Sequence, residues 1–305
     1  MLLSVILPNY NGRQLLESHF LLNYRVLEKE AGDDFEIIVT DDNSVDQSRE
    51  FIEQLGLPNV RFLLNPGKRG FGSNCGHGAQ NALGECLFFL NTDVVLTEGF
   101  LAPLMNKLNN EKVFSVVPKI IRESANGMVE SITTGSLSSC EIQLQFKNKF
   151  SKNPDLDHKV LWTCGAALLC KRELFFQLGG FSDEYNPYYV EDVDLSVTAW
   201  REGYENWHVG SSVVLHHHNS TTKKEWKPKK KFIHLRNLEI FNLKHMPKLE
   251  RMACFKKKLI ASLKRFDFYK VLALLLAYRA LPKKERDYPY SFHDVLGFVE
   301  EKNRV

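Results

Sequence analysis

Short apolar segments alternate with longer segments of helical periodicity over the first third of the chain. The apolar segments have the length and composition of buried strands, and they cover residues 4–7, 35–40, 60–64 and 86–90. Helices are predicted between them, over about 14–30, 46–55 and 73–83. This alternation predicts an α/β fold whose central sheet is mainly parallel and is connected by βαβ crossovers.

A polar cluster follows each predicted strand, where open parallel sheets bind their ligands. The clusters cover residues 8–12, 41–46, 65–72 and 91–93. Together they suit a nucleotide: Tyr10 can stack on a base, Asp41 can accept from a base N–H, and Lys68 with Arg69 can contact phosphate. Each cluster taken singly is equally typical of helix caps and turns.

The rest of the chain is less regular. Residues 123–160 are predicted to form loops and hairpins, followed by a strand over 162–172 and a short helix over 173–178. A helix is predicted over 191–202, and the acidic residues in its first turn, Glu191 and Asp192, are also typical of capping. A further strand over 213–215 leads into His216, His217 and His218.

Composition is near the globular average, with 44% hydrophobic and 25% charged residues among 305. These values exclude a wholly disordered, collagenous or coiled-coil protein. The net charge of +3 is distributed unevenly: residues 1–222 carry −10, residues 223–286 carry +15 and residues 287–305 carry −2. We therefore expect an acidic domain over 1–222 and a basic, helical C-terminal extension over 223–305.

The N-terminus has no basic leader, and no apolar run approaches the roughly 18 residues of a membrane span. The six cysteines include no CxxC pair, which predicts reduced thiols and argues against a disulfide framework or a zinc site. These features predict a cytoplasmic protein.

Lysine clusters in the basic segment, at 223–224, 229–231, 256–258 and 283–284, are interleaved with apolar residues. Leu259, Leu263 and Phe266 have near-helical spacing with basic residues between them, which predicts an amphipathic helix on an anionic membrane surface. The alternative is a solvated helical bundle packed on the acidic domain. Nucleic-acid binding is disfavoured because no recognition motif accompanies the charge.

Over about residues 3–222 the sequence resembles the family 2 glycosyltransferases of the GT-A fold, and in particular the rhamnosyl- and galactofuranosyl-transferase-like branch. The resemblance rests on Val-Ile-Leu-Pro-Asn-Tyr-Asn at 5–11, Asp-Asp-Asn-Ser-Val-Asp at 41–46, Arg-Gly-Phe-Gly at 69–72, Asn-Thr-Asp-Val at 91–94, Gly-Gly-Phe-Ser-Asp-Glu at 179–184 and Glu-Asp-Val-Asp-Leu at 191–195 with a later histidine.

The resemblance implies roles for these residues. Asp93 would be the main ligand of Mg²⁺ or Mn²⁺, with His216 as a later ligand and His217 and His218 as alternatives. Asp192 would be the general base, supported by Glu191. The donor nucleotide and its diphosphate would contact Pro8, Tyr10, Asn11, Asp41, Asp42, Lys68, Arg69, Asn91 and Thr92.

The implied activity is inverting, metal-dependent transfer of a hexosyl group from a nucleoside-diphosphate-sugar to a glycan or a polyprenyl-diphosphate-linked acceptor in cell-surface polysaccharide synthesis. The enzyme would be peripheral on the inner face of the plasma membrane. Asn91 and Gly76 depart from the family pattern, and the Gln-x-x-Arg-Trp motif of processive synthases is absent from the sequence, which favours non-processive transfer.

Two other functions compete with this interpretation. One is a catalytically degenerate carbohydrate- or nucleotide-binding protein that has kept the fold. The other is a dinucleotide-dependent oxidoreductase, suggested by Gly70 and Gly72, although Cys75 occupies the third glycine position of that fingerprint.

Overall fold

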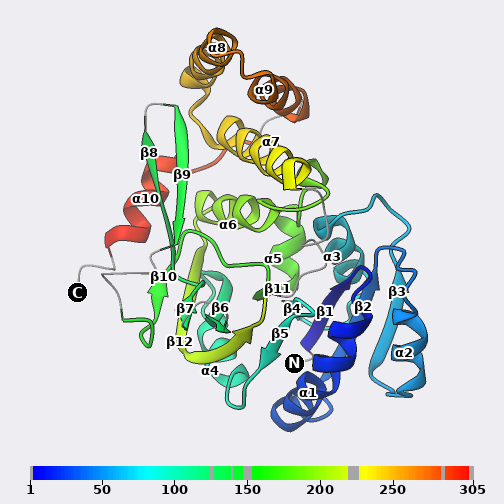
Figure 1. The fold of residues 1–305 in the computed structure, drawn as a ribbon. Coiled ribbons are helices and arrows are strands. Elements are labelled where there is room, and N and C mark those ends of the chain that lie inside the picture. Colours follow the sequence, from blue (N-terminus) through cyan, green and yellow to red (C-terminus); the bar gives the residue numbers. More distant parts are fainter. Residues whose placement is uncertain are drawn as a thin grey trace.

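The structure is a computed structural model that describes residues 3–123, 127–138, 140–146, 153–218, 227–282 and 286–301. Strands and helices alternate through its first part, as the periodicity predicts (Figure 1). These elements are β1 (Leu3–Asn9), α1 (Arg13–Ala31), β2 (Phe35–Asp41), α2 (Ser48–Gln54), β3 (Val60–Leu64), α3 (Phe71–Gln80), β4 (Cys86–Leu90), β5 (Val94–Leu96) and α4 (Leu101–Leu108).

The second part of the chain completes the sheet and adds a hairpin. Its elements are β6 (Val113–Arg122), β7 (Met128–Val129), β8 (Thr133–Ser138), β9 (Glu141–Phe146), β10 (His158–Lys159), β11 (Ala167–Lys171), α5 (Arg172–Gln177), the short 3₁₀ helix η2 (Asp183–Tyr185), α6 (Glu191–Arg201) and β12 (Glu205–His216). The main sheet has the order β10-β12-β6-β11-β4-β1-β2-β3. β1 is parallel to β2 and β4, whereas β11 is antiparallel to β4 and β6, so the predicted mixed, mainly parallel sheet is confirmed.

The central strands are buried on both faces because helices cover both sides of the sheet. In β1, Val5 and Leu7 belong to the core on one side, whereas Ile6 packs on the other with α3 residues such as Cys75. This alternation explains why these strands read as continuous apolar runs in the sequence.

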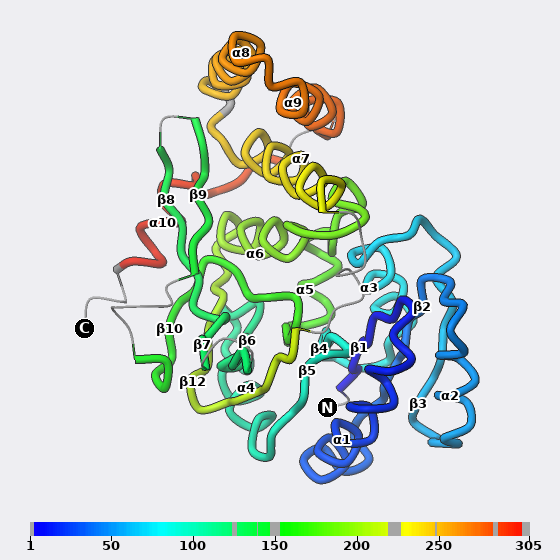
Figure 2. Tube along the Cα trace, viewed as in Figure 1, coloured from blue at the N-terminus to red at the C-terminus, as the bar shows by residue number. Residues whose placement is uncertain are grey.

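In the described residues after the sheet the chain forms the helices α7 (Lys227–His245), α8 (Lys248–Lys264), α9 (Phe268–Ala280) and α10 (Phe292–Glu301). They share a hydrophobic core with α6 and the β8–β9 hairpin. Figure 2 shows the chain rising from the sheet into α7, α8 and α9, and then returning so that α10 lies beside the hairpin. Within the described ranges no helix has both the length and the apolar character of a bilayer span. The predicted boundary at 222/223 and the lysine clusters at 223–224 and 283–284 lie outside the described residues.

The expectation that the thiols are all reduced is wrong for one pair. Cys140, at the turn of the β8–β9 hairpin, forms a disulfide with Cys254 in α8, 114 residues away. Cysteine spacing cannot reveal such a pair, because packing of α8 against the hairpin brings the two residues together. Cys75, Cys86, Cys164 and Cys170 are free thiols.

Candidate functional site

The polar segments that follow β1 and β2 form one hydrogen-bonded unit. Asp41 is 1% exposed, and its carboxylate accepts from the Asn9 side chain at 2.8 Å and from the Ser44 backbone N–H at 2.7 Å. The backbone N–H of Asn11 donates to the Ser44 hydroxyl at 2.7 Å. Asp41 thus organises the loop, and direct contact between this carboxylate and a nucleotide base stays a prediction.

An aromatic ring and a cation lie together beside this unit. The Arg69 guanidinium lies 5.6 Å from the centre of the Tyr10 ring, and Tyr10 is 45% exposed. Next to Arg69, the backbone N–H of Gly70 donates to Asp42 at 2.8 Å. A Cβ at Gly70 would lie only 2.2 Å from the Asn186 side-chain oxygen, so the close packing here requires glycine. The exposed Lys68 precedes Arg69.

Asp93 and His216 meet at the ends of neighbouring strands. Asp93 comes just before β5, His216 is the last residue of β12, and the two strands pair antiparallel. His216 Nε2 lies 3.3 Å from Asp93 Oδ1. The other oxygen, Oδ2, is buried and has no hydrogen-bond partner among the described residues. A buried anionic oxygen beside an imidazole nitrogen is a donor set that fits a divalent cation.

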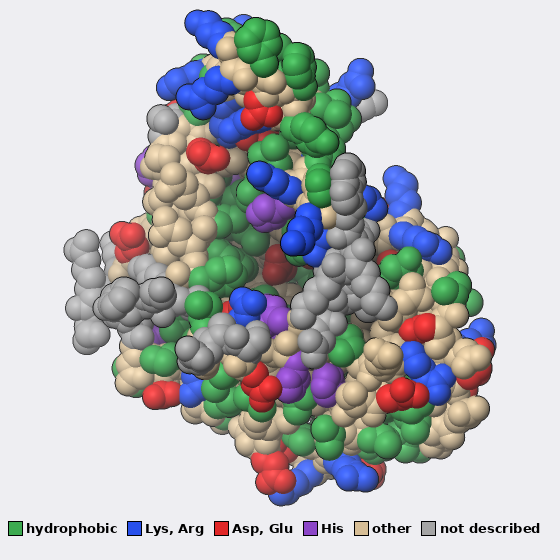
Figure 3. Space-filling view, viewed as in Figure 1, with side chains coloured by type: hydrophobic (Ala, Val, Ile, Leu, Met, Phe, Trp, Pro, Cys, Tyr) green, Lys and Arg blue, Asp and Glu red, His purple; other side chains and the backbone are tan. Residues whose placement is uncertain are grey.

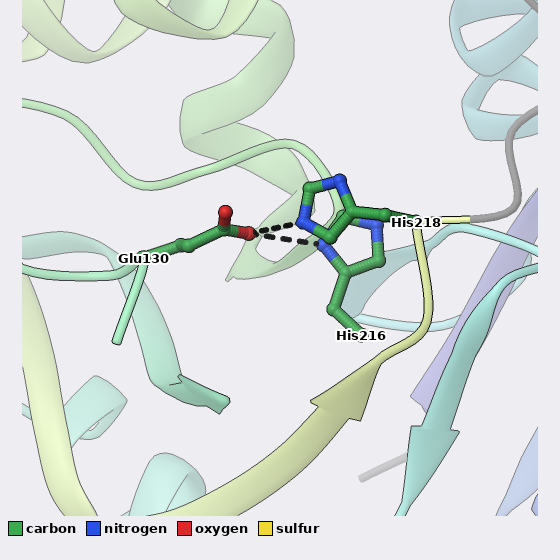
Figure 4. A group of neighbouring side chains, drawn as sticks. All are labelled: Glu130, His216 and His218. Carbon is green, nitrogen blue, oxygen red and sulfur yellow. Dashed lines mark hydrogen bonds and ion pairs between the residues drawn. The ribbon is translucent and has the colours of Figure 1, made fainter. Parts of the chain in front are cut away.

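Glu130 extends this cluster from the segment between β7 and β8 (Figure 4). Its Oε2 lies 3.3 Å from His216 Nδ1 and 2.6 Å from His218 Nε2. Burial opposes the charged imidazolium, but the hydrogen bonds to Asp93 and Glu130 outweigh it and raise the pKa of His216 to about 9. Sequence reasoning missed Glu130, because it lies in a region predicted only as loops and hairpins.

The second and third histidines of the run have other partners than Asp93: His217 lies outside the cluster, whereas His218 belongs to it. His217 Nδ1 lies 2.9 Å from Glu123, and its ring stacks on His19 at 4.9 Å. His218 contacts Glu130, and the centre of its ring lies 3.9 Å from that of His216. Of the three candidates, His216 is therefore the one placed against Asp93.

Glu191 and Asp192 begin α6. Asp192 accepts from the backbone N–H of Gly165 at 2.8 Å, while Glu191 Oε2 is buried without a hydrogen-bond partner in the described part of the chain. Burial raises the pKa of Glu191 well above its ordinary value, and the neighbouring Asp192 charge adds to this effect. Burial also raises the pKa of Asp192, against the opposing hydrogen bond from Gly165.

The loop before α6 is held by a residue that sequence reasoning did not identify. Tyr189 and Val190 adopt positive φ angles of 78° and 81°, which are costly for a β-branched residue such as Val190. The Asn237 side-chain nitrogen, in α7, donates to the carbonyls of Tyr185, Tyr188 and Tyr189 at 2.7, 2.9 and 2.9 Å. Helix α7 thus fixes the loop that presents Asp192.

The thiol of Cys164 lies between the start of α6 and the cluster that contains Glu130. Its pKa is raised to about 12, first by burial and then by the charges of Asp192, Glu130 and Glu191. One thiol therefore lies within electrostatic reach of both the acidic start of α6 and the Glu130–histidine cluster.

Figure 3 shows the molecule hollowed between the lobe formed by α7, α8 and α9 and the body, with acidic and histidine side chains in and around the hollow.

The other predicted donor residues lie at the same edge of the sheet. Pro8 pairs in register with Thr40, just before the Asp41 loop. Asn91 is half-buried and donates its backbone N–H to the Ala166 carbonyl at 2.9 Å, and the Thr92 carbonyl lies 2.9 Å from His19 Nδ1. The structure thus places these residues near the site, and their contacts with a donor stay predictions.

Sequence relatives share only part of this chain. It is 36% identical over 110 residues to a GalNAc(5)-diNAcBac-PP-undecaprenol beta-1,3-glucosyltransferase of Campylobacter jejuni, covering 35% of this chain and 34% of that protein. It is 23% identical over 203 residues to an N-acetylglucosaminyl-diphospho-decaprenol L-rhamnosyltransferase of Mycobacterium tuberculosis, covering 59% and 66%. It is 26% identical over 177 residues to N-acetylgalactosaminyltransferase 6 of Drosophila melanogaster, covering 56% and 27%. The chain thus spans about a third or less of the length of the Campylobacter and Drosophila proteins.

Solved structures confirm the fold. A mannosyltransferase from Pyrobaculum calidifontis, solved with GDP-Man and Mn²⁺, matches at TM-score 0.56 and 15% identity, over 91% of this chain and 86% of its own. Residues 1–349 of S. aureus TarS with UDP-GlcNAc match at 0.58 and 16%, over 92% and 82%. Both likenesses agree with the predicted GT-A fold. The family model for glycosyl transferase family 2 matches residues 4–179, more than half of the chain, and the protein belongs to that family.

Proposed function

We propose that this protein is an inverting, metal-dependent, non-processive hexosyltransferase that uses a nucleoside-diphosphate-sugar donor. The acceptor is a hydroxyl group of a glycan or of a polyprenyl-diphosphate-linked sugar in cell-surface polysaccharide synthesis. The observation that carries this proposal is the buried Asp93 oxygen beside His216, which no described residue pairs, at the same edge of the sheet as the Tyr10–Arg69 contact.

Asp93 and His216 would hold the divalent cation, Mg²⁺ or Mn²⁺. Their carboxylate and imidazole donors suit either ion, and a structural neighbour of the same fold was solved with Mn²⁺. When bound, the cation supplies Lewis-acid stabilisation of the departing diphosphate. Glu130 holds the His216 ring from its opposite nitrogen.

The donor would lie along the loops after β1, β2 and β3. Tyr10 offers an exposed ring face for the base, and Lys68 and Arg69 offer cations for the diphosphate. Asp41 and Asp42 stabilise these loops, because each carboxylate accepts a hydrogen bond from a backbone N–H of a loop residue. Asn11, Pro8, Asn91 and Thr92 complete the proposed donor-contacting set.

Asp192 would accept the proton from the acceptor hydroxyl. Burial gives this carboxylate a raised pKa, which makes it a stronger base than an exposed aspartate. Burial and the neighbouring Asp192 charge also raise the pKa of Glu191, which would support Asp192 from the same helix turn. A single base suffices for a one-step displacement with inversion.

The acceptor is proposed to be lipid-linked because the names of the Campylobacter and Mycobacterium relatives specify undecaprenol and decaprenol diphosphates. A soluble enzyme domain that serves such an acceptor must work at the membrane surface. We therefore propose a peripheral location on the inner face of the plasma membrane.

A donor panel tests the proposal. The purified protein would be incubated with UDP-, GDP- and dTDP-sugars, with Mn²⁺, Mg²⁺ or EDTA, and release of the nucleoside diphosphate would be measured. We expect metal-dependent turnover with at least one donor, and a fall in kcat of about 100-fold or more in Asp192→Asn with unchanged donor affinity.

Replacement of the exposed Asp155 by Asn serves as the matched control and should leave turnover unchanged. Full activity of Asp192→Asn would overturn the assignment of the base. Donor binding without turnover under every condition would favour the degenerate binding protein instead.

A further inference from the structure

The helical hairpin formed by α8 and α9 concentrates large apolar side chains that face solvent. Such surface is seldom contiguous on a soluble protein unless it contacts a partner or a membrane. The exposed residues are Leu249, Met252, Ile260, Leu263, Phe266, Phe268, Tyr269, Leu272, Leu275 and Tyr278. Figure 3 shows apolar side chains running down the α9 side of the upper lobe towards the hollow.

Helix α9 is apolar on nearly all sides, which is typical of a helix covered all round. Ala273, Leu274 and Ala277 are buried where α9 packs on α7 and α8. Leu272 and Leu275, on another side of the same helix, are 50% and 44% exposed. Among the described residues this second side is only partly covered, so large apolar side chains of α9 face solvent.

Phe266, at the turn between α8 and α9, is an independent sign of function. It adopts a φ of 55°, a left-handed conformation that is a genuine outlier for a bulky residue, and its side chain is 78% exposed. Glycine or asparagine would occupy this turn at lower cost. Packing within the described residues does not account for a strained phenylalanine that leaves most of its side chain exposed, which points to a contact outside the folded chain.

Basic side chains border the apolar surface. Lys256, Lys257, Lys264 and Arg265 are exposed on α8 and at its end. Lys258, in the middle of the predicted cluster, is instead committed to an ion pair with the buried Glu239 at 2.7 Å. The exposed cations next to exposed aromatic rings complement an anionic lipid surface.

We propose that the α8–α9 hairpin docks this protein on an anionic membrane. Phe266, Phe268 and Tyr269 enter the interface, and Lys264 and Arg265 contact lipid phosphates. The hairpin is rigidly mounted, because the Cys140–Cys254 disulfide and the Lys258–Glu239 ion pair fix α8 to the rest of the chain. Docking in this way would hold the hollow between the α7–α9 lobe and the body beside the membrane. The use of this position, access to a lipid-linked acceptor, rests on the proposed function.

This surface differs from the amphipathic face predicted from sequence. Leu259, which the spacing groups with Leu263 and Phe266, packs against the core shared by α6 and α7. The docking surface is therefore the tip of the hairpin and the open side of α9, and not one stripe along α8.

Vesicle co-sedimentation without donor or acceptor tests the inference. The full chain would be mixed with vesicles of phosphatidylcholine alone, or of phosphatidylcholine with phosphatidylglycerol, at low salt and at ~0.5 M NaCl. We expect binding to the anionic vesicles that weakens with salt. The double variant Phe266→Ser/Phe268→Ser should reduce the partition coefficient about tenfold or more. Lys264→Gln/Arg265→Gln should reduce it several-fold at low salt only.

The matched controls lie away from the hairpin: Leu83→Ser removes another apolar side chain, 72% exposed, and Arg25→Gln another exposed cation. Both should bind vesicles like the wild type.

Absence of wild-type binding, or equal binding by the Phe266/Phe268 variant, would overturn the inference. The inference would also be overturned if the apolar patch proved to be a dimer contact. In that case the wild type would be a dimer that does not bind vesicles, and the Phe266/Phe268 variant would be a monomer. Vesicle binding without sugar transfer would leave docking intact and count against the proposed function alone.

Discussion

Glu130 Oε2 lies 3.3 Å from His216 Nδ1, while the other ring nitrogen of His216 lies 3.3 Å from Asp93. Glu130 thus orients the imidazole so that Nε2 faces the carboxylate proposed to hold the cation. A carboxylate that fixes a metal-binding histidine from its far nitrogen sets both the ring orientation and the tautomer.

Removal of this positioning contact should weaken metal binding. Glu130→Ala is expected to raise the Kd for Mn²⁺ about 10- to 100-fold, measured by titration calorimetry in the absence of donor, and Glu130→Gln should have a smaller effect because its amide oxygen can still accept. Glu123→Gln, which alters the partner of His217, is the matched control and should keep wild-type affinity. An unchanged Kd in Glu130→Ala would show that Glu130 has no part in holding His216.

Asn237→Ala should impair turnover by releasing the loop before Asp192. The change removes a buried amide shared by three carbonyls, so we expect a loss of about 2–3 kcal/mol in the free energy of unfolding together with a lower kcat. Asn242 is a matched control on the same helix, because its buried side chain accepts from Ile142 in the β8–β9 hairpin at 2.7 Å. Asn242→Ala should lose similar stability in urea unfolding but keep kcat; equal kcat losses in both variants would argue for a purely structural role of Asn237.

Stability should fall on acidification because of His245. Burial lowers the pKa of this histidine to about 4, although its hydrogen bond to Asp194 opposes the shift. Between pH 6.5 and about 4 the unfolded chain binds a proton at His245 that the folded protein does not, so unfolding is favoured as pH falls through this window. Protonation of His245 should lower the free energy of unfolding by up to about 3 kcal/mol across this pH window. Urea unfolding at pH 6.5 and 4.5 measures this loss.

His245→Gln should reduce this pH dependence while lowering stability at neutral pH, because the contact with Asp194 is altered. Part of the dependence should remain, since burial also lowers the pKa of His208 to about 4. Replacement of the exposed His293 by Asn should leave the dependence unchanged. A wild-type free energy of unfolding that is constant between pH 6.5 and 4.5 would contradict the buried neutral state of His245.

The Cys140–Cys254 disulfide should stabilise the C-terminal helices. Because it closes a loop of 114 residues, its removal in Cys140→Ala/Cys254→Ala is expected to cost about 2–4 kcal/mol. Urea unfolding of the wild type with and without dithiothreitol provides the comparison. Reductant should bring the wild type close to the double variant and should leave the double variant itself unchanged; a wild type indifferent to reductant would show that the disulfide contributes nothing.

The sequence alone determined the sheet and which polar residues lie at its edge. Strands β1, β2 and β4 are buried along nearly their whole length, so their apolar runs are unambiguous, and the polar residues that follow must meet at one edge. The resemblance to the family supplied the proposed roles of Asp93, His216 and Asp192, which stay predictions. The structure confirms the fold and places these residues along one side of the sheet, with Asp93 and His216 in contact.

Only the tertiary structure decided which of three consecutive histidines faces Asp93, and that Glu130 lies behind it. It also decided that Asn237 in the basic segment holds the loop before Asp192, and that Cys140 pairs with Cys254. These relationships join residues about 50 to 123 positions apart, through side chains whose types are common on any surface. Local pattern specifies which elements form, whereas packing between distant elements selects which polar side chains meet.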